Sequence, residues 1–287
     1  VRIPAGTYAG NLTIDKPITL RGAGNATHLV GDGTGSVIRV SADRVAVSSL
    51  RISGVGQNVS VESIPGRNET DWDYRVAMGY GYGDAGVEFD SSNDSMVADV
   101  RIDTPANGVL FRYSEDSTVV GTTVHGTDEW ADGFMGVMVF ESRLVVQDSS
   151  FDGGRDGVYT HLAHGIVIRN NTMRGMRFGV HEMFTSDALV THNRVREVNV
   201  GLIVMTTPTG NLIVENDVRE SVEGVSIAGS DSYIAGNVLA NNRIGLAVSG
   251  QRSLYERNVV AANDLGIRAE TVLPTNRVTG NDVVAND

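Results

Sequence analysis

The chain has 287 residues, with 23 basic and 35 acidic side chains, a net charge of −12 and no cysteine. The lack of cysteine excludes disulfides, zinc–thiolate sites and thiol catalysis. The negative charge argues against a nucleic-acid partner, because phosphates would be repelled, and no apolar run reaches the roughly 18 residues of a membrane-spanning helix. Lys16 is the only lysine. An acidic, lysine-poor surface suggests a halophilic source, although GC-rich codon usage also favours arginine.

Residues 1–54 predict a series of short strands. The segments in which apolar residues recur at strand spacing are Leu12–Ile14, Ile18–Leu20, Ser36–Val40, Val45–Val47 and Leu50–Ile52. Residues 55–85 break this pattern, because Trp72 and three tyrosines stand among Gly, Asp and Arg. We expect a long inserted loop there, and long loops in compact domains are often functional.

A glycine followed by an aliphatic residue recurs from residue 86 onward. These glycines are Gly86, Gly108, Gly136, Gly157, Gly179, Gly201, Gly224, Gly245 and Gly266. They stand 21 to 23 residues apart, except for an interval of 28 before Gly136 that predicts a shorter inserted loop at 125–135. The first residue after each glycine is apolar and the third mostly so, which is the period-two pattern of a strand with one buried face.

A second repeat consists of asparagines at the same spacing: Asn171, Asn193, Asn216, Asn237, Asn258 and Asn281. A unit of about 22 residues has room for two or three short strands, but not for a long helix. Pairing of like strands in successive coils therefore predicts a parallel β-helix, with the asparagine amides stacked in an internal ladder. We expect an all-β solenoid in which residues 1–287 form a single domain.

Four successive coils carry soft side chains on their outward face. If the first and third residues after each glycine point inward, the second and fourth point outward. These are Met138, Tyr159, His181 and Ile203, and Phe140, His161, Met183 and Met205. Stacking at about 4.8 Å makes His161, Met183 and Met205 neighbours, and thioether sulfur with imidazole nitrogen suits Cu(I) better than Mg²⁺ or Ca²⁺.

Simple packing under the loop 55–85, or a protein-docking surface, would use the same outward residues. The alternation also turns Glu182 inward, where a lone carboxylate is costly. The patch is thus a candidate copper site or a candidate interface, and the pattern alone does not separate the two.

Two other classes of function are open at this point. A polysaccharide-active β-helix enzyme, a lyase or hydrolase, would need paired carboxylates, or carboxylates around calcium with an arginine base. The candidates are Asp128, Glu129 and Asp132 in the shorter insert, and Asp152, Arg155 and Asp156 beyond it. Such clusters also arise by chance on a surface of charge −12. A purely structural or adhesion protein would need no soft-ligand patch.

Two coils resemble the NosD family. The stretch Arg177-Phe-Gly-Val-His-Glu-Met-Phe-Thr185 resembles the family signature Arg-Tyr-Gly-aliphatic-His-aromatic-Met-Tyr-Ser. Val200-Gly-Leu-Ile-Val-Met-Thr206 resembles the following Val-Gly-Tyr-Ala-Leu-Met-Tyr-Ser, and the opening segments Pro4–Tyr8 and Ile14–Gly22 are similar to the family's first coils. Some positions depart from the family pattern: Phe178, Glu182, Phe184 and Thr206.

The resemblance implies a right-handed, single-stranded parallel β-helix outside the cytoplasmic membrane, in the periplasm or on the outer face, and a non-enzymatic role. NosD proteins act with an ABC transporter, made of an ATPase and a permease, in building the copper–sulfur centre of nitrous oxide reductase. The resemblance implies transient Cu(I) binding at His181, Met183 and Met205, which match motif positions. Geometry adds further possible ligands: His161, Met176, Met138 and Tyr159. Docking of a copper chaperone or of the reductase on this patch is the alternative.

Overall fold

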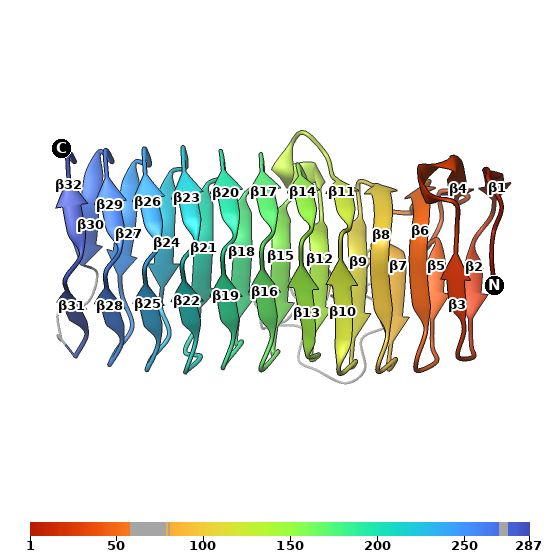
Figure 1. Cartoon of the computed structure of the whole chain (residues 1–287), viewed down its shortest axis with the longest axis horizontal. Coiled ribbons are helices and arrows are strands. Elements are labelled where there is room, and N and C mark those ends of the chain that lie inside the picture. Colours follow the sequence, from red (N-terminus) through yellow and green to blue (C-terminus); the bar gives the residue numbers. More distant parts are fainter. Residues whose placement is uncertain (58–78, 80, 270–274) are drawn as a thin grey trace.

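Most coils of the chain are built from three short strands, and the coils stack on one another in parallel (Figure 1). The computed structural model describes residues 1–57, 79, 81–269 and 275–287. Like positions of successive coils lie in register, as in the row Val137, Val158 and Val180. One face of the stack is a sheet of 11 strands, one from each coil. The predicted all-β parallel β-helix with coils of about 22 residues is confirmed.

The 11-stranded sheet carries the glycine repeat and is called the glycine sheet below. Its strands are β2 (Leu12–Ile14), β5 (Ile38–Val40), β7 (Ala85–Asp90), β9 (Asn107–Arg112), β12 (Met135–Phe140), β15 (Asp156–His161), β18 (Phe178–Met183), β21 (Val200–Met205), β24 (Glu223–Ile227), β27 (Ile244–Val248) and β30 (Leu265–Ala269). The first two strands have three residues each, whereas those from β7 onward have five or six.

The other two strands of each coil belong to a 21-stranded sheet with two rows. The first row is β3 (Thr19–Arg21), β10 (Ser117–Val120), β13 (Leu144–Gln147), β16 (Val167–Arg169), β19 (Leu189–Thr191), β22 (Leu212–Val214), β25 (Tyr233–Ala235), β28 (Leu254–Glu256) and β31 (Arg277–Thr279). The second row is β1 (Gly6–Ala9), β4 (Thr27–Val30), β11 (Thr123–His125), β14 (Ser150–Asp152), β17 (Thr172–Arg174), β20 (Arg194–Arg196), β23 (Asp217–Arg219), β26 (Val238–Ala240), β29 (Val259–Ala261) and β32 (Asp282–Val284). Two longer strands, β6 (Ala46–Ser53) and β8 (Met96–Asp103), join the rows. The segments Val45–Val47 and Leu50–Ile52, predicted as separate strands, thus fall in β6.

The repeated glycines are required because neighbouring coils approach closely at that point. A Cβ added to Gly157 would lie 2.6 Å from the carbonyl oxygen of Gly179 and 3.0 Å from the sulfur of Met173. Met173 belongs to the interior core, so the glycine faces inward like the valine after it. The residue before the glycine faces outward again, as Met135 does when it packs beside Met138. The glycine therefore interrupts the period-two alternation.

The predicted asparagine ladder is confirmed. Asn171 donates from Nδ2 to Oδ1 of Asn193 at 3.0 Å, and the same bond repeats along the stack to Asn281. The backbone N–H of each asparagine also donates to the next side-chain oxygen. A second ladder, which we did not predict, links Asn242, Asn263 and Asn286. These bonds satisfy turn groups that would otherwise be buried without partners.

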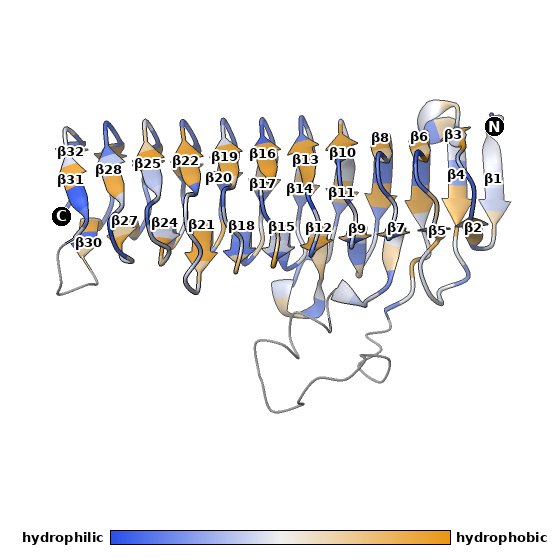
Figure 2. Cartoon of the chain, turned by 90° about the horizontal axis from the view of Figure 1, so that it is seen from below, coloured by the Kyte–Doolittle hydropathy of each residue, from blue (hydrophilic) through white to orange (hydrophobic). Residues whose placement is uncertain are grey.

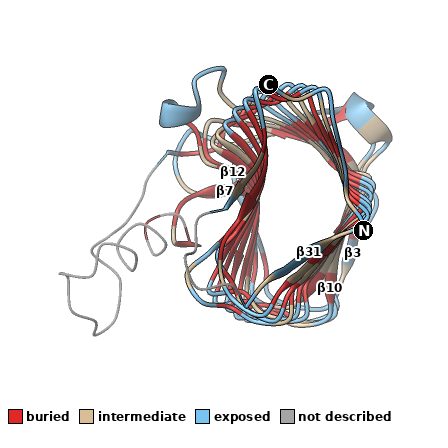
Figure 3. Cartoon of the chain, turned by 90° about the vertical axis from the view of Figure 1, so that its left-hand side faces the viewer, coloured by how far each residue is buried: buried red, intermediate tan, exposed pale blue. Residues whose placement is uncertain are grey.

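Apolar residues recur at the strands of every coil and fill the interior of the solenoid (Figure 2). Viewed end-on in Figure 3, the coils superimpose, with β7 and β12 on one side of the outline and β3, β10 and β31 on the other. Of the predicted long loop 55–85, residues 58–78 and 80 lie outside the described residues. In the predicted shorter insert, the 3₁₀ turn η3 (Trp130–Asp132) lies between β11 and β12, and a similar turn, η1 (Gly24–Ala26), precedes β4.

Candidate metal centre

The soft side chains lie on the outer face of the glycine sheet, but they do not form an exposed patch. Met138, His161, His181 and Met183 are each no more than 6 % exposed, whereas Met205 is 36 % exposed. Our sequence interpretation as a surface patch was therefore wrong for these four residues and for Tyr159 and Phe140, whereas Ile203 is half-buried and Met205 is exposed. The reason is that other parts of the chain cover this face. Gly81 lies so close to the Phe140 ring that a Cβ added to the glycine would be 3.2 Å from it. Tyr82 and Phe134 pack on the outer apolar cluster that contains Phe140 and Met183.

His181 and Met205 form the closest contact between two soft donor atoms in this region. The Nε2 atom of His181 lies 3.2 Å from the sulfur of Met205. The two residues come from neighbouring strands, since β18 and β21 pair with Met183 opposite Met205 and His181 opposite Ile203. The contact is therefore diagonal across the two paired strands. Of its two residues, Met205 is the one exposed to solvent.

A buried ion pair lies behind His181. The Nδ1 atom of His181 is 2.9 Å from Oδ2 of Asp156, and Arg177 donates from Nε to Oδ1 at 2.9 Å and from Nη2 to Oδ2 at 2.6 Å. The Asp156 side chain is completely buried. Burial would raise the pKa of Asp156, but the hydrogen bonds from His181 and Arg177 outweigh it and the pKa is lowered. Asp156 is thus an ionised carboxylate held by two partners.

Burial lowers the pKa of His181, even though the Asp156 carboxylate acts in the opposite direction. The imidazole is therefore neutral near pH 7. A neutral imidazole has one N–H and one nitrogen lone pair. Asp156 is an acceptor at 2.9 Å from Nδ1, so a neutral imidazole that donates to it has its N–H on Nδ1 and its lone pair on Nε2, 3.2 Å from the Met205 sulfur.

His161 and Met183 belong to a more enclosed part of the same face. The Tyr159 hydroxyl lies 3.2 Å from Nδ1 of His161 and donates to the Met183 sulfur at 3.5 Å. The His161 ring stacks on Phe140, with 5.7 Å between centroids, and meets the edge of Phe184. His161 and Met183 lie opposite each other on β15 and β18. The Tyr159 hydroxyl group thus bridges the His161 ring and the Met183 sulfur.

The remaining two candidates are Met138 and Met176. Met138 is fully buried in the outer apolar cluster that also contains Tyr159 and Met183, and it stands opposite Tyr159 in the strand register. Met176 belongs to the interior core of the solenoid. The structure therefore brings together His181 and Met205, with His161 and Met183 next to them, and leaves Met176 on the other side of the sheet.

Glu182 points into the solenoid, as the alternation indicated. Its Oε2 atom accepts a hydrogen bond from Nδ2 of Asn211 at 3.1 Å, while Oε1 has no hydrogen-bond partner among the described residues. Burial raises the pKa of Glu182 to about 8. The carboxyl group is therefore protonated at neutral pH, which reduces the cost of its position between Thr160 and Val204.

The carboxylates proposed for an enzymatic site are divided by the structure. Asp128 and Asp152 line an open groove of about 330 Å³ with His125, Arg174 and Glu197. Asp156 is instead engaged by Arg177 and His181 on the glycine sheet. Glu129 and Asp132 are exposed at the η3 turn. Within the part of the chain that is described, no group of three His, Cys, Asp or Glu side chains is placed to hold a metal ion.

Asp156 and Arg177 were not assigned to the soft site by our sequence analysis. We counted the alternation only from each glycine onward, so Asp156, which comes before Gly157, was not considered. Asp156 faces outward because the glycine interrupts the pattern. The available signal was position: Asp156 occupies the place of Met135 and Phe178 in the adjacent coils, where apolar residues stand.

Residues 135–287, more than half of the chain, match the family described as periplasmic copper-binding protein (NosD). The chain belongs to the NosD family. The resemblance seen in the sequence is thereby confirmed, and the match includes every strand that contributes His161, His181, Met183 or Met205. NosD is described as periplasmic, and membership implies a role in assembling the copper site of nitrous oxide reductase. The family is generally non-catalytic. A halophilic source stays a prediction.

Solved structures with the same fold have diverse descriptions. An exopolygalacturonase from Thermotoga maritima aligns over 100 % of this chain and 83 % of its own, with TM-score 0.67 and 12 % identity. PfbA, a surface adhesin of Streptococcus pneumoniae, aligns over 99 % and 83 %, with TM-score 0.72 and 13 % identity. The periplasmic alginate epimerase AlgG aligns over 94 % and 67 %, with TM-score 0.67 and 16 % identity.

At these identities the likeness concerns the fold alone. No curated protein matches the NosD-family chain by sequence. Among its described residues, no helix is long and apolar enough to cross a membrane.

Proposed function

We propose that this NosD-family protein is a non-enzymatic accessory that holds Cu(I) transiently during assembly of the copper–sulfur centre of nitrous oxide reductase. His181 and Met205 are the first ligands, and Met183 and His161 are the adjacent donors. The observation that carries this proposal is the 3.2 Å contact between Nε2 of His181 and the sulfur of Met205. With the proton on Nδ1, neither atom can donate, so two lone pairs converge where an electron-pair acceptor would bind.

The chemistry of the pair fits Cu(I). Thioether sulfur and neutral imidazole nitrogen are ligands that suit this soft cation, whereas Mg²⁺ and Ca²⁺ prefer carboxylate and carbonyl oxygen. The nearest carboxylate, Asp156, is already neutralised by Arg177. The copper ion is cargo here, and a site with two protein donors leaves coordination positions open for a donor or acceptor protein.

Met205 is the entry side of the proposed site. It is the one thioether of the set that is exposed, and it ends β21 at the edge of the outer face. Met183 lies directly opposite Met205 on the neighbouring strand, at the roughly 4.8 Å spacing of paired strands. A cation bound first at Met205 and His181 would thus have a second sulfur one strand away, in the more enclosed part of the face.

The proposed partners follow from family membership. They are the ATPase and permease of an ABC transporter, a copper chaperone that supplies the ion, and nitrous oxide reductase, which receives it. Nucleic acid is excluded as a partner by the net charge of −12. The exposed side chains next to the site, Leu162 and Phe184, are both more than a third exposed and offer apolar contact area beside Met205.

An anaerobic Cu(I) titration against a competing chelator tests the proposal. The native protein is compared with a Met183→Leu, Met205→Leu double variant, in which volume is nearly conserved. Met96→Leu is the matched control, because Met96 on β8 is exposed to the same extent as Met205, 37 % against 36 %. We expect about one ion per chain, bound at least tenfold more weakly in the double variant and unchanged in the control. Absence of saturable binding by the native protein would contradict the proposal.

A further inference from the structure

We infer that Asp156 and Arg177 are positioning residues that fix His181 in its Nδ1–H tautomer, so that the lone pair on Nε2 faces Met205. The consequence for copper rests on the function proposed above. The tautomer itself does not, because it is a property of the metal-free protein. Neither residue belongs to the ligand set that the sequence or the family resemblance gave.

The carboxylate decides where the proton of His181 lies. Oδ2 of Asp156 is 2.9 Å from Nδ1, and an ionised carboxylate can only accept hydrogen bonds. An unprotonated Nδ1 would turn its lone pair toward the anionic oxygen of Asp156, which costs far more than facing the neutral, weakly accepting sulfur of Met205. Arg177 Nη2 also lies near Nδ1, at 3.4 Å, but this contact is longer than the one to Asp156. The proton of the imidazole is therefore bonded to Nδ1 and points toward Oδ2 of Asp156.

Arg177 fixes the orientation of this carboxylate and lies as a positive charge beside it. Its guanidinium group engages both oxygens of Asp156 in a fork, which is the strongest geometry for such a pair. The guanidinium carbon also lies 4.2 Å from the centroid of the Phe178 ring. The Asp156 carboxylate, fully buried, would be too costly without this partner. Arg177 thus acts on His181 through Asp156.

The arrangement occurs at one step of the stack and is not a product of the repeat. In register with Asp156 stand Met135 on one side and Phe178 on the other. In register with His181 stand Tyr159 and Ile203. A ladder that served only to stabilise the solenoid would recur from coil to coil, as the asparagine ladder does. A carboxylate behind a histidine is the arrangement that orients metal-binding imidazoles in general.

Nitrogen NMR of metal-free, ¹⁵N-histidine-labelled protein tests the inference directly. Long-range proton–nitrogen correlations distinguish a protonated from an unprotonated ring nitrogen, and a His181→Gln variant assigns the signal. We expect His181 to carry its proton on Nδ1 near pH 7. A ring protonated on Nε2 would overturn the inference, whatever the result of the copper titration.

Asp156→Asn separates positioning from simple packing. Asparagine has one acceptor oxygen where aspartate has two, so in either orientation its NH₂ group faces an N–H of Arg177 and the fork is lost. We therefore expect the preference for the Nδ1–H tautomer to be lost, so that the two tautomers mix, and the affinity for Cu(I) to fall by about 10- to 100-fold. Glu197→Gln is the control, since Glu197 pairs with Arg174 on the exposed surface of the neighbouring strands.

Two results for the variants would contradict the positioning role. One is a folded Asp156→Asn protein that keeps both the Nδ1 proton and the native affinity. If Asp156→Asn does not fold, Arg177→Lys provides the second test, because lysine keeps the charge but not the fork. We expect Arg177→Lys to weaken Cu(I) binding and to mix the two tautomers, and a single Nδ1–H tautomer with native affinity would overturn the role of Arg177. Loss of copper binding in the native protein would instead count against the proposed function and leave the tautomer result standing.

Discussion

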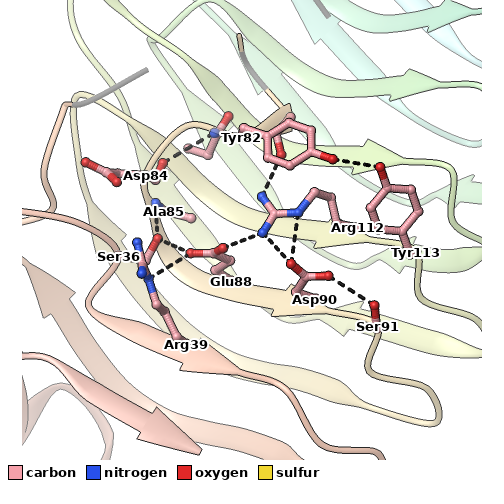
Figure 4. A network of polar contacts seen from close by, with 12 residues as sticks. Ser36, Arg39, Tyr82, Asp84, Ala85, Glu88, Asp90, Ser91, Arg112 and Tyr113 are labelled. Carbon is pink, nitrogen blue, oxygen red and sulfur yellow. Dashed lines mark hydrogen bonds and ion pairs between the residues drawn. The ribbon is translucent and has the colours of Figure 1, made fainter. Parts of the chain in front are cut away.

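Two buried polar regions lie on the outer face of the same sheet, and they differ in whether their donors and acceptors are satisfied. The first, on β5, β7 and β9, is an ionic network around Arg112 (Figure 4). Arg112 donates to Glu88 and Asp90, both at 2.7 Å, and to the carbonyl oxygen of Gly81 at 2.8 Å. The second is the His181–Met205 pair on β18 and β21, where Nε2 of His181 lies 3.2 Å from the sulfur of Met205.

The comparison shows that burial of polar groups on this face does not by itself indicate a binding site. In the Arg112 network the charges match and Ser36 and Arg39 complete the contacts of Glu88. Arg112 also lies against the Tyr82 ring, whose hydroxyl group bonds to that of Tyr113. This network therefore fixes the segment 81–85 to the solenoid. With the inferred tautomer, the pair on β18 and β21 keeps two lone pairs that form no hydrogen bond. Lone pairs of this kind are what a cargo cation needs as ligands.

Removal of Arg112 is expected to have the largest effect on stability. Arg112→Ala leaves the buried Glu88 carboxylate without its main counter-ion and frees the Gly81 carbonyl. We expect a loss of about 3 kcal/mol in the free energy of unfolding, measured by chemical denaturation. Arg143→Ala is the control, because Arg143 pairs with Glu115 and Asp116 on the surface and should cost under about 1 kcal/mol. Equal losses in the two variants would refute the structural role assigned to the network.

Glu182→Gln is expected to stabilise the protein at neutral pH. The pKa of Glu182 is near 4.5 in the unfolded chain and about 8 in the folded protein. Folding therefore takes up a proton between these pH values, and the stability contributed by the protonated group is lost as pH rises from 4.5 to 8. The loss at pH 7 is about 3 kcal/mol. Glutamine mimics the protonated acid, so the advantage of the variant in melting temperature should grow from pH 4.5 to 8.

The control for this effect is Glu197→Gln, which changes an exposed carboxylate of the same type. It should show no such growth with pH. A constant difference between Glu182→Gln and the native protein across this range would mean that Glu182 is ionised in the folded state, against the burial argument.

The repeat could be predicted from the sequence because it imposes one residue type at one place in every coil. Gly157 is fixed by the closeness of the next coil, and Asn171 by the hydrogen bond to Asn193. Each constraint is local to a coil and its neighbour, so it appears in the sequence at a fixed interval. The soft side chains His181, Met183 and Met205 were found for the same reason, since stacking turns a regular interval into contact.

Cover by the loop 55–85 was one of our alternatives, but the residues that cover and support the site could not be predicted from the repeat. The cover includes Tyr82, which comes about 100 residues before His181 in the sequence and belongs to no repeat. The support depends on Asp156, which faces outward only because Gly157 interrupts the alternation. Both features are irregularities, and a periodic pattern gives no information about its own exceptions.

Oxidation of methionine sharpens the comparison at the level of single side chains. With dilute hydrogen peroxide, which transfers one oxygen atom to the thioether and leaves water, Met205 and Met96 should react at similar rates because their exposed fractions are 36 % and 37 %. Met138 and Met183 should react more slowly, since both are buried. Ag(I), a soft cation without redox chemistry under these conditions, should protect Met205 severalfold but not Met96. Peptide mass spectrometry measures each site, and equal protection of both methionines would mean that the cation binds exposed thioethers without preference for the His181 pair.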